Sequence, residues 1–229
     1  MAVNPSLRLS ELRNRWWFPD HLHIAPLWKD LLQVSHYARG YFLDLGCGNT
    51  PYRKWFTSRV QKYVAVDHPP HSPAAEVGCS AEHLPFRDAC FDTVFCTQVL
   101  EHVPRPWVAA AEITRILKPD GILILSCPQY WRLHEIPRDY FRFTPYGLHV
   151  LFPESHWQWL EHRQQGSTWA VIACALWSSF GSFGRGKRLI SFFLNPVFMA
   201  LDRLWSNTND TTNHLIVIAR KSKMQTTDR

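Results

Sequence analysis

Short apolar runs alternate with segments of helical periodicity along most of the chain. Two of these segments, Ile24–Tyr37 and Trp107–Leu117, place their apolar residues on one helical face. The apolar runs are four to six residues long and nearly unbroken, which is typical of strands buried on both faces of a sheet. These runs are Tyr41–Leu45, Tyr63–Val66, Phe91–Cys96 and Ile122–Ser126. The alternation predicts an α/β fold with a mostly parallel sheet.

The C-terminal part of the chain carries a different pattern. His156–His162 and Asn213–Ala219 are predicted as its last two strands. Between them, residues 168–206 hold two apolar stretches on either side of the basic segment 184–188. We interpret them as a pair of helices packed on the sheet. The alternative is an interfacial element, because apolar faces beside basic residues suit a membrane with anionic headgroups.

Turn and capping residues add local predictions. Lys118–Gly121 carries a Pro-Asp-Gly sequence and is predicted as a turn. Thr144 is a good N-cap and Pro145 a good first helical residue, so a helix is predicted over Tyr146–Leu151. Pro51–Arg59 is predicted as a short amphipathic helix after the first strand.

Two glycines follow the first predicted strand. Gly46 and Gly48 are expected to form a tight turn, since glycine tolerates positive φ and lets a ligand approach the backbone. Open α/β sheets bind ligands at this edge. Asp44 lies at the strand exit, where its carboxylate is expected to accept hydrogen bonds from a cationic ligand. Pro51 stands where a dinucleotide fingerprint has its third glycine, which disfavours a nicotinamide dehydrogenase.

Asp67 ends the second predicted strand. It follows Gly48 by 19 residues, and an acidic residue at about this distance accepts hydrogen bonds from ribose hydroxyls. Several nucleoside cofactors carry that ribose. Asp67 therefore indicates a nucleoside cofactor without choosing among them.

The stretch Asp44–Asn49, the segment Gly78–Phe86 and the order of strands and helices together resemble class I S-adenosylmethionine (SAM) methyltransferases of the type 11 and ubiquinone-biosynthesis group. The resemblance covers roughly Tyr41 to Pro128. It implies a three-layer Rossmann-like sandwich, with a seven-stranded mostly parallel sheet, an antiparallel last strand and a helical insert before it. In the group, the position of Ser80 contacts the adenine amino group and the next backbone N–H contacts the ring. The implied cofactor-binding residues are Asp44, Gly46, Cys47, Gly48, Asp67, His68, Ser80, Ala81 and Gln98.

The resemblance also implies the chemistry. SAM brings an activated methyl group, so the protein has to align the acceptor, and a hydroxyl acceptor needs a base. His102, His134 and Asp139 are the candidate catalytic residues, because they follow the fourth and fifth strands. Some ubiquinone-pathway members hold a divalent metal with an acidic-x-x-Glu-His set, which corresponds here to Gln98, Glu101 and His102. No metal is predicted, because Gln98 replaces the first acidic ligand.

Composition narrows the remaining choices. A chain of 229 residues is expected to form one domain, with an N-terminal segment and helix (1–39), a core (40–167), the apolar insert (168–206) and a last strand with a polar tail (207–229). The net charge of +6 comes without a basic run, so no nucleic-acid partner is expected. Six cysteines without a C-x-x-C pair, and no signal sequence, favour the cytoplasm.

Two functions follow as alternatives. The first is a methyltransferase acting on a small-molecule, lipid-linked or sugar-linked acceptor. The second is a non-catalytic SAM-fold module that uses its aromatic C-terminal insert, residues 168–206, for partner or peripheral membrane contact. Neither the acceptor nor the oligomeric state is specified by the sequence.

Overall fold

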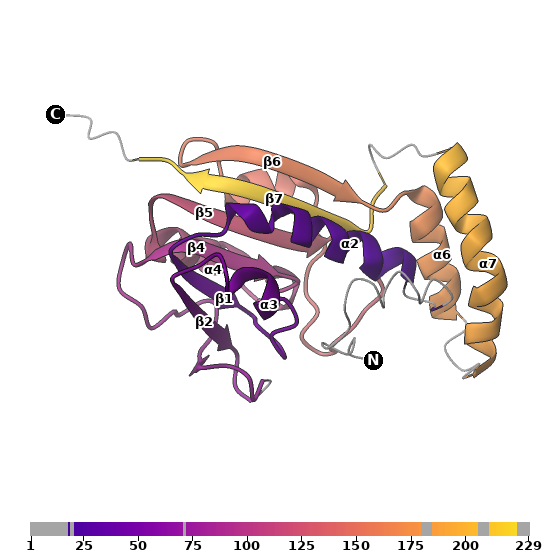
Figure 1. The fold of residues 1–229 in the computed structure, drawn as a ribbon, viewed down its shortest axis with the longest axis horizontal. Helices are drawn as coiled ribbons and strands as arrows, with labels where there is room; N and C mark the ends of the chain where they lie inside the picture. The colour runs from indigo at the N-terminus through magenta and orange to yellow at the C-terminus, as the bar shows by residue number, and fades with distance from the viewer. Residues whose placement is uncertain (1–17, 19–20, 71, 180–184, 206–210, 224–229) are drawn as a thin grey trace.

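Seven strands form one sheet among residues 18, 21–70, 72–179, 185–205 and 211–223, which the computed structural model describes (Figure 1). They are β1 (Tyr41–Leu45), β2 (Lys62–Asp67), β3 (Val77–Gly78), β4 (Phe91–Thr97), β5 (Leu117–Pro128), β6 (Trp157–Gln165) and β7 (His214–Lys221). Their order across the sheet is β3-β2-β1-β4-β5-β7-β6. The first five are parallel and β7 is antiparallel to both neighbours, so the predicted sheet is confirmed.

Helices cover both faces of this sheet. They are α2 (His21–Val34), α3 (Arg53–Phe56), α4 (Pro106–Ile116), α5 (Pro145–Leu151) and the 3-10 helices η1 (Ser35–Tyr37) and η2 (Leu100–His102). Leu31 of α2 and Phe42 of β1 belong to the core on one face. Ile113 of α4 and Leu43, the next residue of β1, belong to the core on the other. Burial on alternating sides makes a three-layer sandwich and explains the unbroken apolar runs.

The structure confirms some of the predictions that rest on capping and turn residues and changes others. The Thr144 hydroxyl accepts a hydrogen bond from Gly147 N (3.0 Å), and α5 begins at Pro145, as predicted. Only α3 forms within the helix predicted over Pro51–Arg59. The predicted turn Lys118–Gly121 falls inside β5, where it interrupts the pairing with β4 as a bulge.

The predicted helical insert is confirmed as two helices, α6 (Thr168–Ser179) and α7 (Arg185–Leu204). The pair packs on α2 and not, as predicted, on the sheet. Trp177 of α6 packs with Leu22 of α2 and with Leu194 and Phe198 of α7. Its indole N–H donates to Asn195 Oδ1 at 3.2 Å. The pair stands beyond one edge of the sheet (Figure 1). This is the edge where β5 ends, because Pro128 at the end of β5 pairs with His214 at the start of β7.

One face of α7 has no partner among the described residues. Leu189, Phe193, Val197 and Leu204 recur at helical spacing, and all four are exposed. No helix in the described part of the chain combines the length and the apolar character that crossing a bilayer requires. The insert therefore packs on its inner side and presents an apolar surface, α7's outer face, on the other.

Candidate functional site

The two glycines after β1 serve different purposes. Both have positive φ, 71° at Gly46 and 49° at Gly48. A Cβ on Gly46 would lie 2.2 Å from Val99 Cγ2, so the close approach of the loop after β4 requires glycine there. A Cβ on Gly48 would meet no atom within 4 Å. Only at Gly48 is the backbone open to an approaching ligand.

Asp67 ties the loops after β1 and β2 together. Its Oδ2 accepts a hydrogen bond from Gly48 N at 2.8 Å, and its Oδ1 accepts one from His68 N at 2.7 Å. The Ser72 hydroxyl donates to Gly48 O in the same turn. Each carboxylate oxygen keeps a further lone pair, so Asp67 can still accept hydrogen bonds from a diol beside Gly48.

The loop after β3 joins this group. Cys79 N donates to Asp67 O at 2.9 Å, which places the following residues beside the glycine turn. The Ser80 hydroxyl accepts a hydrogen bond from Glu82 N at 3.2 Å, and Ala81 is buried. The structure thus brings Gly48, Asp67 and the Ser80 loop to one half of the sheet edge, over β1, β2 and β3.

Asp44 differs from its predicted role. Its side chain is almost fully buried and accepts a hydrogen bond from the Tyr63 hydroxyl of β2. Burial raises the pKa of Asp44 to about 7, although the Tyr63 hydrogen bond opposes the shift. The structure therefore gives Asp44 a buried partner, Tyr63, in place of the exposed position that the predicted contact with a cationic ligand requires.

Cys47 lies in the same turn. Burial, together with the nearby Asp44 and Asp67, raises the pKa of the Cys47 thiol to about 12. The thiol therefore stays protonated at neutral pH and is a poor nucleophile.

Gln98 marks the middle of the edge, where β4 ends beside β5. It has a positive φ of 56°, its N–H donates to Ser126 O at 2.9 Å, and its Nε2 donates to Ser126 Oγ at 3.1 Å. Strand order reverses between β1 and β4, which is the position where open α/β sheets bind ligands. Gln98 therefore separates the glycine half of the edge from a second group of polar residues.

That second group begins with Glu101 and His102 in η2. Glu101 is fully buried, and neither of its carboxylate oxygens has a hydrogen-bond partner among the described residues. Burial raises the pKa of Glu101 to about 8. His102 Nδ1 lies 2.5 Å from Arg138 O, which can only accept, so Nδ1 carries the proton and Nε2 keeps its lone pair. Nε2 lies 3.9 Å from Glu101 Oε1.

Asp139 also differs from its predicted role. The Arg142 guanidinium donates to both of its oxygens, at 2.6 and 2.8 Å, and His134 N donates to Oδ2 at 2.8 Å. Burial alone would raise the pKa of Asp139, but these hydrogen bonds hold it at about 2. A carboxylate with so little affinity for a proton is a poor general base at neutral pH. Asp139 instead orients His134.

His134 comes from the loop after β5 and faces His102. Its Nδ1 lies 3.2 Å from Asp139 Oδ2 and 3.3 Å from Arg132 O, both acceptors, so Nε2 keeps its lone pair. Burial and the neighbouring His102 lower the pKa of His134, which favours the neutral ring. The two rings are nearly perpendicular, with centroids 4.6 Å apart.

Glu101, His102 and His134 together form one cluster, in which one donor atom from each lies within 4.8 Å of the others. The sequence predicts His102 and His134 as separate catalytic candidates and does not place Glu101 among the site residues. Hydrogen bonds from Tyr140 N and Phe141 N to Glu101 O, at 2.8 and 3.3 Å, and from His102 Nδ1 to Arg138 O bring the loop after β5 onto η2. No local sequence pattern reports that contact.

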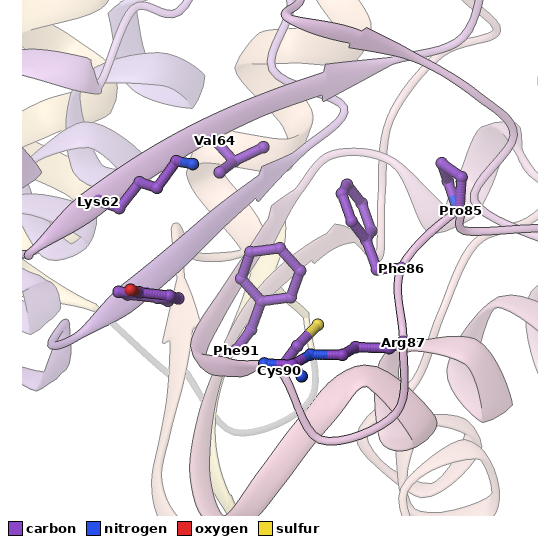
Figure 2. Close-up of a pocket in the computed structure, with 8 residues that line it drawn as sticks. Lys62, Val64, Pro85, Phe86, Arg87, Cys90 and Phe91 are labelled. Atoms are coloured by element: carbon purple, nitrogen blue, oxygen red, sulfur yellow. The ribbon is translucent and has the colours of Figure 1, made fainter.

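A pocket of about 300 Å³ lies elsewhere (Figure 2). Figure 2 shows Phe86 and Phe91 on its wall, with Lys62 and Arg87 beside them. Lys62 and Phe91 are the first residues of β2 and β4. The pocket therefore belongs to the opposite end of these strands from the glycine turn and the histidine cluster.

Comparison with known proteins agrees with the geometry. A family model described as a methyltransferase domain matches residues 43–125. An uncharacterized methyltransferase of Mycobacterium sp. (strain KMS) is 35% identical over 112 residues, covering 45% of this chain and 44% of that protein. One from Mycolicibacterium paratuberculosis is 36% identical over 116 residues, covering 44% and 46%. The chain matches less than half the length of these relatives.

Solved structures share the fold. An S-adenosylmethionine dependent methyltransferase from Mesorhizobium loti superposes with a TM-score of 0.56 at 14% identity, covering 87% of this chain and 100% of that one. The [4+2]-cyclase SpnF superposes with a TM-score of 0.57 at 17% identity, covering 86% and 81%. Because one of the two is described as a cyclase, the fold alone does not specify the reaction.

Proposed function

We propose that this chain, whose residues 43–125 belong to the methyltransferase domain family, transfers a methyl group from SAM to an acceptor held beside the histidine cluster. The observation that carries the proposal is Asp67. Its carboxylate is fixed by Gly48 N and His68 N next to the open backbone at Gly48. A ribose diol needs acceptors at this place, and a bulky side chain at position 48 would exclude it.

The residues of the glycine half fit SAM as follows. Asp67 would bind the ribose hydroxyls, the backbone at Gly48 would approach the amino acid part, and Ser80 and Ala81 would line the adenine. When bound, SAM supplies a methyl group on a positively charged sulfur, already activated for transfer. The buried Asp44 lies beneath this half of the edge and adds negative potential there whenever it is ionised.

The acceptor half favours an oxygen nucleophile. His102 and His134 both keep an Nε2 lone pair, and their rings lie close together over η2. A neutral amine needs no help to attack, whereas a hydroxyl has to lose a proton. Leu133 and Ile136, which flank His134 in the same loop, are exposed and would lie against an apolar part of the acceptor.

The outer face of α7 supports a lipid-linked acceptor over a freely diffusing one. Its four apolar residues stand beyond the edge of the sheet that carries the candidate site. The sequence places Arg185, Lys187 and Arg188 at the first turn of the same helix. We propose that α7 rests on an anionic lipid surface, which would bring the site to an acceptor in that surface.

Calorimetry on the purified chain tests the cofactor. SAM and its demethylated product are expected to bind with one site each, and NADH is expected not to bind. The glycine turn has Pro51 in place of the third glycine of the dinucleotide fingerprint, which lets the helix pack closely on the strand. Tighter binding of NADH than of SAM would contradict the proposal. A chain that binds SAM but transfers no methyl group to lipid, sugar or small-molecule acceptor pools would instead support the non-catalytic alternative.

A further inference from the structure

We propose that Glu101, His102 and His134 bind one divalent cation of the zinc type. The three side chains come from two loops at the same edge of the sheet, η2 after β4 and the loop after β5. One donor atom from each lies within 4.8 Å of the others. Gln98, which bonds to Ser126, is not part of the group. The third donor is therefore His134, from the loop after β5, and not the residue at position 98.

The strongest observation is the buried carboxylate of Glu101. Its side chain has no exposed surface, and neither oxygen has a hydrogen-bond partner in the described part of the chain. A buried polar group without a partner is costly, and native proteins rarely keep one without a role. Its Oε1 lies 3.9 Å from His102 Nε2, which is too far for a hydrogen bond. A bound cation would satisfy the carboxylate.

The outer hydrogen bonds already orient both imidazoles for such an ion. His102 Nδ1 bonds to Arg138 O at 2.5 Å, and His134 Nδ1 faces the Asp139 carboxylate at 3.2 Å. Histidines that bind metals almost always give their other ring N–H to a backbone carbonyl or a carboxylate. Here His102 uses a backbone carbonyl and His134 uses a carboxylate. Both Nε2 lone pairs are left for the ion.

The donor set selects the cation. Two imidazole nitrogens and one carboxylate form the His₂Glu set of catalytic zinc sites, which keep a fourth position open. Mg²⁺ prefers oxygen ligands in octahedral geometry and is a poor match. The donors have to move closer, since a tetrahedral ion with bonds of about 2.1 Å brings them to within about 3.4 Å of one another. His134 is partly exposed, with 26% of its side chain accessible, which leaves room for that movement.

The consequence for catalysis rests on the proposed function. With both Nε2 lone pairs on the ion, a hydroxyl acceptor in the open position would lose its proton to water and not to an imidazole. The loss would be easier because the cation stabilises the oxygen anion. That oxygen then forms a bond to the methyl carbon as the carbon–sulfur bond breaks, and the electron pair of the broken bond stays on sulfur. The acceptor class is thereby an alcohol or a phenol rather than an amine.

Zinc titration tests the site directly. The full chain, treated with a chelator and desalted, is titrated with ZnCl₂ by calorimetry. Wild type is expected to bind one Zn²⁺ per chain, with no competition from Mg²⁺. Glu101→Gln keeps the shape of the side chain and His134→Ala removes one nitrogen. Each is expected to weaken binding by more than the roughly 10–100-fold that follows loss of an outer-shell partner.

The matched control is His36→Ala, which removes a histidine outside the cluster and should leave the affinity unchanged. Circular dichroism shows whether each variant folds. If Glu101→Gln does not fold, His134→Ala alone tests the site. Absence of stoichiometric zinc in wild type, or equal affinity in wild type and His134→Ala, would overturn the site. SAM binding on the same samples separates the two proposals. A chain that binds SAM but not zinc would contradict the zinc site and leave the proposed function standing.

Discussion

At the residue scale, the same side-chain type has opposite roles in different surroundings. Asp44, Asp67 and Asp139 all lie at or near the carboxyl edge of the sheet. Burial raises the pKa of Asp44 to about 7 against the opposing Tyr63 hydrogen bond, while Arg142 holds that of Asp139 at about 2. Among the described residues, backbone N–H groups bind the carboxylate of Asp67, which keeps lone pairs for a ligand. The neighbours of each carboxylate decide its chemistry, and the residue type does not.

Asp67→Ala is expected to weaken SAM binding by about 1.5–3 kcal/mol, the size of hydrogen bonds to a charged group. The variant loses both the ribose acceptor and the bonds that hold Gly48 N and His68 N. Calorimetry with SAM measures the change. Glu154→Ala, which removes an exposed carboxylate after α5, is the control and should bind SAM as wild type does. An unchanged affinity in Asp67→Ala would remove this residue from the site.

At the element scale, α2 and β7 meet through buried histidines. The rings of His23 in α2 and His214 in β7 lie 4.0 Å apart, and His23 stacks on Trp131 at 3.4 Å. Neither nitrogen of His214 has a hydrogen-bond partner among the described residues. Burial, with a smaller contribution from His134, lowers the pKa of His214 to about 3. The contact therefore depends on a neutral ring.

The sign of the pH dependence follows from that shift. The unfolded chain takes up a proton on His214 below its ordinary pKa of about 6.5, whereas the folded chain does not until about pH 3. Stability from this residue is present above pH 6.5 and is lost as the pH falls. Between about pH 7.5 and about pH 5, wild type should lose about 2 kcal/mol more unfolding free energy than His214→Phe. Urea unfolding at the two pH values measures it, and equal losses would contradict the assignment.

At the scale of the whole molecule, one edge of the sheet carries three surfaces. The glycine half lies over β1, β2 and β3, the histidine cluster follows β4 and β5, and the α6–α7 pair stands beyond the end of β5. The insert forms the predicted pair of helices, but Trp177 packs it on α2 and not on the sheet. The outer face of α7 remains exposed, and we propose that it contacts a lipid surface.

Vesicle sedimentation tests that contact. Wild type is expected to sediment with vesicles of phosphatidylcholine and phosphatidylglycerol and to be released at high salt, because screening weakens the attraction of basic residues to anionic lipid. Phe193→Asp on α7 should reduce the bound fraction several-fold. Val150→Asp, which places the same charge at an exposed apolar position of α5, is the matched control. Equal sedimentation of the two variants would exclude α7 as the contact.

The sequence by itself determined the parts of this protein that depend on neighbours along the chain. Unbroken apolar runs indicated buried strands, because a strand covered on both faces needs apolar residues at every position. Thr144 and Pro145 began a helix, since a cap acts within one turn. The glycine turn at Gly46 and Gly48, and the spacing along the chain from Gly48 to Asp67, indicated a nucleoside site.

The tertiary structure decided what depends on residues far apart in the chain. Gly46 is required because Val99 approaches it, and Asp44 is buried because Tyr63 of the next strand binds it. Glu101 and His134 form one cluster only because the loop after β5 folds back onto η2. Burial and the distance between donor atoms set the pKa of a carboxyl group and its capacity to bind a cation. Those quantities exist only once the strands have brought their ends together.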